Sequence, residues 1–377
     1  MSRGLGDVYK RQVNKHLKLQ GTIGAELNYF IFEDFKAPTT PGYEAGYLQN
    51  SNFRNRMYNF ELLALYNNTW GNFDFNATLG GNVYKVNNQT NITTAQDMQI
   101  RDVVALMSFN ETSLEQNSYR KQINSVYGAV NVGWKHMIYF DATLRGDQSS
   151  TLPIGNNVYI YPSFSGSFVF SELLKQSNWM PYGKVRLSWA QVGSDTDPYQ
   201  LGLVYTKSKY TYPSYTIGYI NNSTMPNKNL KPTKTNSFEV GFEMKFLQNR
   251  IGLDFTYYTQ NSKNQIMGMA SSWTSGYNYR LINAGEIENK GIEIALNTRP
   301  IQLKDFSWDL NLNFSKNSNK VKKLVDDMDM FELEKAAWLD VQVAAKVGEN
   351  FGAIVGPDFK RNENGDILID PQTGLPQ

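Results

Sequence analysis

The chain of 377 residues contains no cysteine, which excludes disulfide bonds, thiolate zinc sites and cysteine nucleophiles within it. Charged residues are sparse at 19%, and the net charge is only +2. Without a run of basic residues, this balance argues against nucleic acid as a partner. The sequence also lacks any apolar run of about 18 residues, so it predicts no transmembrane helix.

Histidine is nearly absent as well. The two histidines, His16 and His136, are far apart in the sequence, which argues against a metal pair or a Ser-His-Asp triad. No P-loop or dinucleotide-binding glycine motif is present. The sequence therefore predicts neither an enzyme nor a cofactor. A phospholipase barrel, which needs a Ser-His pair near one rim, is disfavoured for the same reason.

Aromatic residues are abundant, with 23 Tyr and 21 Phe, and many of them alternate with polar residues. Apolar side chains occupy every second position in 238–246, and the alternation resumes in 251–257 after a turn at Gln248-Asn249-Arg250. This pattern predicts a β-hairpin with one apolar and one polar face. Two environments explain it equally well, a soluble sandwich with a wet outer face and a membrane barrel with a polar lumen.

The connections between the expected strands favour the barrel, because they are alternately short and long. Outer-membrane barrels have short periplasmic turns and long extracellular loops, whereas a sandwich has no reason to sort loop length by parity. We predict an all-β fold, an antiparallel up-and-down transmembrane β-barrel present only as a partial barrel of about eleven strands. These strands are expected at 14–32, 52–69, 72–86, 123–134, 138–147, 159–170, 183–195, 233–247, 250–266, 287–299 and 307–319. Long polar loops are expected at 33–51, 87–122, 148–158, 196–232, 267–286 and from 320 onward.

The first twelve residues fit neither this alternation nor a signal peptide. The stretch from Met1 to Gln12 resembles translated adapter sequence, and we predict that residues 1–12 are a non-native leader. Residues 13–377 are then expected to form the partial barrel with its long extracellular loops. Both ends of the chain are expected to be cut from a longer protein.

Six stretches, in family order, resemble the SusC/RagA family of TonB-linked outer-membrane receptors. Among them are NSVYGAVNVGWKHMIYFDATLRGDQSS at 124–150, GKVRLSWAQVGSDTDPY at 183–199 and NAGEIENKGIEIALNTRPI at 283–301. The usual acidic residue after the loop leucine is missing from Leu230-Lys231-Pro232-Thr233. The signal peptide, TonB-contacting segment and plug domain of the family are absent from this sequence. The other three stretches are 161–173, 225–266 and 347–370.

The resemblance implies a receptor in the outer membrane of a Gram-negative cell, crossing it as a multi-pass β-barrel in contact with outer-membrane lipid. Such receptors import glycans, oligosaccharides or peptides. They work with a SusD-like lipoprotein as a lid and with the TonB complex, reached through the plug region. The alternatives are a soluble or surface β-rich carbohydrate-binding protein and a plain outer-membrane porin.

Aromatic residues in two long loops are the best candidates for contact with a ligand, because flat rings stack on sugar faces or cap peptide side chains. The same rings could instead pack loop on loop or contact the lid lipoprotein. An acidic run at 326–334 could hold calcium, but it lacks the EF-hand pattern, and a solvated acidic face is favoured. The ligand candidates are Tyr210, Tyr212, Tyr215 and Tyr219 in one loop, and Trp273, Tyr277 and Tyr279 in another. The acidic residues are Asp326, Asp327, Asp329, Glu332 and Glu334.

Overall fold

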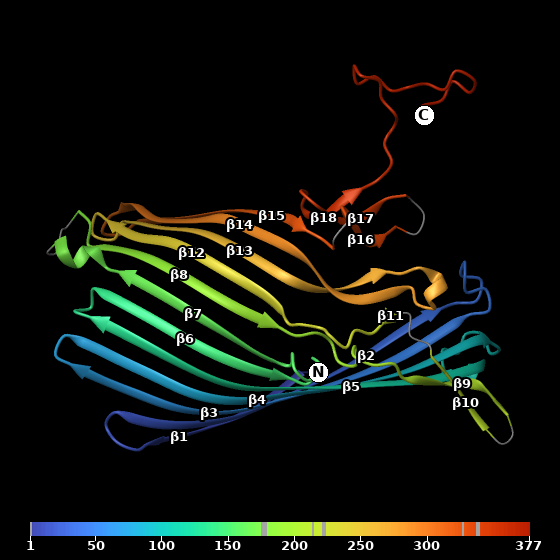
Figure 1. The fold of residues 1–377 in the computed structure, drawn as a ribbon, viewed down its shortest axis with the longest axis horizontal. Helices are drawn as coiled ribbons and strands as arrows, with labels where there is room; N and C mark the ends of the chain where they lie inside the picture. Colours follow the sequence, from blue (N-terminus) through green and yellow to red (C-terminus); the bar gives the residue numbers. More distant parts are fainter. Residues whose placement is uncertain (1, 175–178, 213–214, 221–223, 326–327, 337–339) are drawn as a thin grey trace.

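A computed structural model describes residues 2–174, 179–212, 215–220, 224–325, 328–336 and 340–377. Nearly all the regular structure is β, and no helix in these ranges is long and apolar enough to cross a membrane. Twelve strands follow one another as antiparallel neighbours in a single curved sheet (Figure 1). They are β1 (Ser2–Gln12), β2 (Leu17–Lys36), β3 (Tyr47–Trp70), β4 (Phe73–Met98), β5 (Phe109–Trp134), β6 (Ile138–Ser149), β7 (Val158–Phe168), β8 (Tyr182–Ser194), β12 (Thr233–Phe246), β13 (Ile251–Ala270), β14 (Tyr279–Gln302) and β15 (Ser307–Lys323).

The remaining elements lie in the long connections and at the C-terminal end. Strand β11 pairs in parallel with β14, while β9 and β10 form a separate hairpin and β16 to β18 a separate three-stranded sheet. These strands are β9 (Tyr205–Tyr212), β10 (Tyr215–Ile220), β11 (Thr224–Met225), β16 (Met330–Lys335), β17 (Gln342–Lys346) and β18 (Phe351–Val355). Three short 3-10 turns are η1 (Leu106–Ser108), η2 (Phe170–Leu174) and η3 (Trp273–Ser275).

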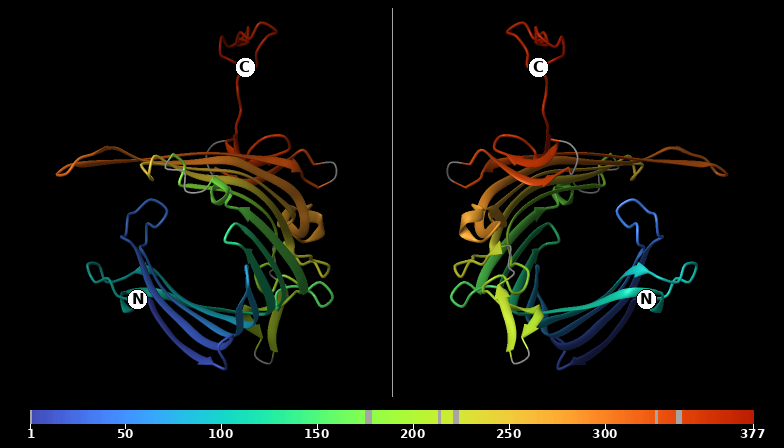
Figure 2. Two further views of the ribbon diagram at one scale, coloured as in Figure 1. Left: turned by 90° about the vertical axis from the view of Figure 1, so that its left-hand side faces the viewer. Right: turned by 90° about the vertical axis from the view of Figure 1, so that its right-hand side faces the viewer.

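The sheet is an open arc. Figure 2 shows it curving through most of a ring, with β1 and β15 at its two free edges. The all-β, antiparallel partial barrel expected from the sequence is therefore confirmed. A single curved sheet also rules out the sandwich, which needs two sheets packed face to face.

One face of the sheet carries a continuous apolar band. Phe242 lies opposite Phe255 with their rings 4.9 Å apart, and the row continues through Ile294 to Phe314. These side chains stay accessible, and Phe314 is 54% exposed. On β12 the band covers 238–246, close to the roughly 9–11 residues that a tilted strand needs to cross a bilayer. This face is suited to lipid.

The strands extend beyond this band at one end. The segments 87–122 and 267–286, expected to be polar loops, are mostly paired strand, with tips at 99–108 and 271–278. That expectation was wrong. In 87–122 polar residues occupy both faces over most of the segment, which removes the alternation without preventing backbone pairing. Most connections at the opposite end are tight turns, such as Lys135–His136, where both residues have positive φ; the longer one between β7 and β8 contains η2. Long hairpins therefore gather at the right of Figure 1 and most short turns at the left.

Strand β1 differs from its neighbours. Residues 2–12, which the sequence analysis left out of the fold, pair with β2 along their whole length. However, Asp7 lies opposite Ile23 and Arg11 opposite Leu19, so two charges occupy rows that are apolar on β2. Charged side chains on the lipid face of a barrel are destabilising. The pairing thus places these residues in the sheet, and the non-native leader stays a prediction.

Candidate functional site

The concave face of the sheet is polar, and its side chains reach over intervening strands. Arg186 on β8 donates to both carboxylate oxygens of Asp254 on β13, at 3.1 and 2.7 Å, and to Thr256 Oγ1 at 2.6 Å. Strand β12 lies between them, and its Gly241 leaves room for the guanidinium. Such bridges are favoured where side chains converge, which is the inside of a curved sheet. They mark this face as the lumen wall.

Several lumen glycines lie beneath aromatic rings. A methyl group on Gly80 would be 2.4 Å from the ring of Tyr127, its partner across β4 and β5. Tyr127 in turn donates its hydroxyl to Glu61 on β3. Tyr139 also lies over Gly133, with its ring 3.1 Å from the position of such a methyl group, a tight contact rather than a clash. Glycine is required at position 80 because the neighbouring ring occupies the space of a side chain.

The TLRGDQSS stretch places its polar residues on this wall. Arg145 donates to Asp147 at 2.9 Å and to Ser125 Oγ at 2.9 Å, while Tyr161 donates to the other Asp147 oxygen at 2.5 Å. Asp147 is only 6% exposed. A buried carboxylate needs such paired donors to remain charged. The motif therefore braces β5, β6 and β7.

A second cluster ties the segment after β8 to the wall. Asp195 accepts from Lys121 Nζ at 2.6 Å, from Thr151 Oγ1 at 3.2 Å and from Ser149 Oγ. Ser149 and Thr151 are both buried. Asp195 is the first residue of the long connection 195–232, so this cluster fixes where that connection leaves the barrel.

The other end of the same connection is clamped by Leu230 and Asn283. Leu230 is fully buried, and the neighbouring Lys231 exchanges two hydrogen bonds of 2.7 Å with the Asn283 side chain on β14. Just before this, Thr224 pairs with Tyr279 in the parallel β11–β14 bridge. The two connections that carry the predicted ligand contacts, 195–232 and 267–286, therefore lie side by side.

The structure places the seven predicted ligand residues in two hairpins. Tyr210 and Tyr212 lie in β9, and Tyr215 and Tyr219 in β10, with Tyr215 opposite Tyr212. The side chains of Tyr215 and Tyr219 are 73% and 46% exposed. Both hairpins lie at the long-loop end of the sheet (Figure 1). Their role in ligand binding stays a prediction. Trp273 lies in η3, Tyr277 follows it, and Tyr279 begins β14.

The acidic run falls in and before β16. Glu332 and Glu334 lie on that strand and Asp329 just before it, whereas Asp326 and Asp327 lie outside the described residues. Across the described ranges, no three His, Asp or Glu side chains gather closely enough to hold a metal ion.

The two histidines lie at the short-turn end of the barrel. His16 Nδ1 contacts the Asn67 carbonyl oxygen at 3.0 Å, and His136, in its tight turn, lies 3.4 Å from Asp74. These are separate contacts on different hairpins.

Comparison with known proteins decides the family. The protein-family model described as "TonB dependent receptor-like, beta-barrel" matches residues 4–332 of this chain. The chain belongs to this family of TonB-dependent receptor β-barrels. It is 27% identical over 304 residues to TonB-dependent receptor P3 of Formosa agariphila, covering 78% of this chain and 30% of that protein.

The resemblance to SusC and RagA is also confirmed. The chain is 29% identical over 229 residues to the TonB-dependent receptor SusC of Bacteroides thetaiotaomicron, covering 58% of this chain and 23% of SusC. The structure of the RagAB peptide transporter matches with a TM-score of 0.79 at 19% identity, over 92% of this chain and 39% of that one. The chain thus spans less than a third of the length of these two curated relatives. Family and fold together imply an outer-membrane location.

The family is one of receptors and transporters, not of enzymes. What the sequence analysis missed is how the lumen wall is braced, in particular the tyrosines over glycines. A glycine on the polar face of a strand was a usable signal, but the ring that covers it lies on another strand. The identity of that ring follows only from the pairing register.

Proposed function

We propose that this chain is part of the barrel of a TonB-dependent outer-membrane receptor that imports glycans, oligosaccharides or peptides. The observation that carries the proposal is the match to the TonB-dependent receptor barrel over residues 4–332. The apolar outer face and the braced polar lumen wall support a membrane-spanning import pathway. Substrates of this size would enter from the end where the long hairpins gather.

The two aromatic hairpins are the proposed contact with the substrate at that end. The exposed rings of Tyr215 and Tyr219 offer stacking surfaces for a sugar or a peptide side chain. The β11–β14 bridge ties the connection that carries the first hairpin to the second. A SusD-like lipoprotein is the proposed lid over this mouth, and the TonB complex the proposed source of energy through the plug region of the complete receptor.

A plain porin is the second candidate function within the barrel class. It differs in that passage through a porin needs no energy and no lid protein. In the source bacterium, deletion of the complete gene should abolish uptake of a fluorescent oligosaccharide or peptide that is too large for porins. A protonophore should have the same effect on the parent strain, because TonB draws on the proton gradient.

Uptake that survives the protonophore but disappears with the gene would instead support the porin. Uptake unchanged by either treatment, tested over both glycan and peptide panels, would remove the import proposal. Complementation with the intact gene is the matched control.

A further inference from the structure

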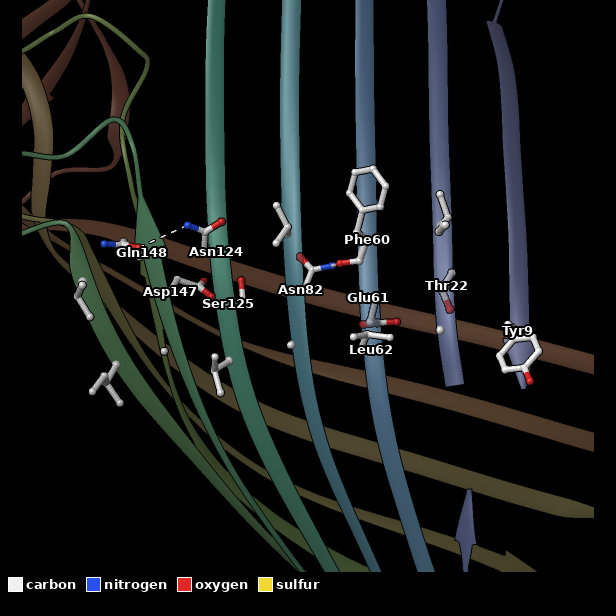
Figure 3. A pocket seen from close by; sticks show the side chains of 18 of the residues that line it. Tyr9, Thr22, Phe60, Glu61, Leu62, Asn82, Asn124, Ser125, Asp147 and Gln148 are labelled. Atoms are coloured by element: carbon white, nitrogen blue, oxygen red, sulfur yellow. Dashed lines mark hydrogen bonds between the residues drawn. The ribbon is translucent and has the colours of Figure 1, made fainter. Parts of the chain in front are cut away.

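A mainly apolar groove crosses the outer face of the barrel over strands β1 to β7, with Asp7 and Tyr9 of β1 at its edge. It encloses about 950 Å³, and Figure 3 shows it from close by. Leu62 and Val126 form ridges on either side of Gly81, and Gly146 follows Val126 in the same cross-strand row. Leu62 is 73% exposed. The groove therefore lies within the band that faces the hydrocarbon of the bilayer.

The fold does not require glycine at the floor of this groove. A methyl group on Gly81 would meet nothing closer than the Ser125 carbonyl oxygen at 3.8 Å, and one on Gly146 nothing closer than Ile160 at 3.6 Å. Both are ordinary contact distances, unlike the 2.4 Å at Gly80 on the lumen side. The hollow is thus a property of the surface rather than a by-product of packing inside the barrel.

Four cations lie on the same outer face, immediately toward the long-hairpin end. Arg56 and Arg120 share one cross-strand row with Asn87 between them, Lys85 lies one row nearer the groove, and Arg54 one row farther. All four are exposed. Lys85 is four residues along β4 from Gly81, about 13 Å at the usual rise of a strand. This is a reasonable distance between acyl chains and a lipid headgroup.

These cations lack acidic neighbours. In the part of the chain that the structure describes, none of the four forms an ion pair, although Arg54 lies 5.7 Å above the ring of Tyr29. The positions facing outward between them on β2 to β5 are apolar or neutral, including Leu27, Tyr58 and Gln122. The cluster therefore presents uncompensated positive charge.

The far side of the barrel is partly compensated. On β13 to β15, Lys263 lies 3.5 Å from Glu286 and Lys322 lies 3.7 Å from Glu288. Lys234, Lys290 and Lys316 also face outward there and, among the described residues, form no ion pair. They therefore serve as the comparison for the four cations above the groove.

We propose that this face binds a phosphorylated glycolipid of the outer leaflet, with its acyl chains in the groove and its phosphates on Arg54, Arg56, Lys85 and Arg120. Arginine and lysine are the usual partners of phosphate, and only an anionic lipid with several chains complements both halves of the surface. The inference depends on the membrane orientation of the barrel and is independent of the imported substrate.

The test uses the complete receptor, purified from outer membranes, stripped of lipid in detergent and titrated by native mass spectrometry. The probes are bis-phosphorylated lipid A, the same lipid without phosphates, and phosphatidylethanolamine. One variant replaces the four cations by Gln and another carries Gly81→Leu and Gly146→Leu. The matched control replaces the outward-facing Lys234, Lys290 and Lys316 by Gln.

We expect the parent receptor to prefer bis-phosphorylated lipid A at least tenfold over both other lipids. The four-cation variant should lose this preference, and the Leu variant should bind all acylated probes at least fivefold more weakly. The control should change less than twofold. Equal binding of the three lipids by the parent, or an equal loss in control and four-cation variants, would overturn the proposal. The Gln substitutions are at exposed positions and leave the strands intact. The four-cation variant therefore tests the proposal even if the variant with Gly81→Leu and Gly146→Leu fails to fold.

Discussion

Tyr258 lies directly over Gly291. The two residues are opposite each other across β13 and β14, and a methyl group on Gly291 would lie 2.7 Å from the Tyr258 hydroxyl oxygen and 2.5 Å from the Lys316 carbonyl oxygen. The Tyr258 hydroxyl continues across the next strand to Asn317, at 3.1 Å. Gly291 is the glycine of the NKGIE stretch, so this contact explains why that stretch carries a glycine.

Gly291→Ala should therefore destabilise the barrel. The ring could turn away, but the Lys316 carbonyl belongs to the backbone of β15 and cannot yield without disturbing the ladder. Overpacking of this kind costs about 1–3 kcal/mol. The measurement is the temperature at which the complete receptor loses its folded, fast-migrating form on a gel.

Gly252→Ala is the matched control, because its nearest neighbour would be the Asn297 carbonyl oxygen at 3.7 Å. A melting temperature lowered equally in both variants would show that the Tyr258 contact has no special role.

Asn283→Ala should loosen the long connection that carries part of the proposed ligand surface. It removes both hydrogen bonds to Lys231 and a third, of 3.1 Å, to the Asn264 carbonyl oxygen. Leaving a buried backbone group without a hydrogen bond costs about 1–3 kcal/mol, and here the cost destabilises the local segment around Lys231. We expect hydrogen exchange in 226–232 to accelerate several-fold. Asn297→Ala, an exposed position on the same strand, should leave that segment unchanged.

The strands could be predicted wherever one face is apolar. The alternation in 238–246 and 251–257 is a local signal, and both segments pair as expected. It fails in 87–98, where Asn, Gln and Thr fill both faces, although the backbone ladder continues. Alternation of apolar and polar residues reveals a strand only where one of its faces is buried or faces lipid. Where the strands extend beyond the membrane, neither face needs to be apolar, so the alternation is lost.

Loop lengths predicted that Tyr215 and Tyr219 lie at the end of the sheet where the long connections gather, and the structure places them there. Their role as a ligand site stays a prediction, and the contacts between the loops were not predicted. The parallel pairing of Thr224 with Tyr279, which brings the two loops together, joins positions far apart in the sequence. Such contacts depend on register and on the path of a long connection, and neither has a local sequence signal.

Tyr219→Ala should weaken binding of the imported substrate. Loss of one stacking ring costs about 0.5–1.5 kcal/mol, or roughly a twofold to tenfold rise in Kd. The measurement is a titration of the complete receptor with the substrate found in the uptake assay. Trp70→Ala, an exposed aromatic next to a short turn at the opposite end, is the control. Unchanged affinity in both variants would show that the substrate binds elsewhere, and contact with the lid lipoprotein would then be the remaining role for these rings.

Residues 1–12 should prove foreign to the natural gene. Asp7 and Arg11 occupy apolar rows beside Ile23 and Leu19, where the natural strand should carry apolar or small residues. A contiguous sequencing read across the locus tests this directly. We expect the frame upstream of Val13 to continue with a different sequence of alternating pattern. A read that retains Asp7 and Arg11 in their present places would refute the leader.

The direction of the barrel in the membrane can be measured because this chain has no cysteine of its own. Ile154 lies 99% exposed in the connection between β6 and β7 at the long-hairpin end, and Asn249 lies in the tight turn between β12 and β13. Short turns of outer-membrane barrels are periplasmic. With any cysteines elsewhere in the complete receptor replaced, Ile154→Cys should react with an impermeant maleimide in intact cells. Asn249→Cys should react only after the outer membrane is permeabilised. The reverse labelling pattern would show that the barrel has the opposite orientation. The four cations would then lie in the inner leaflet, which would contradict the proposed lipid site; they are Arg54, Arg56, Lys85 and Arg120.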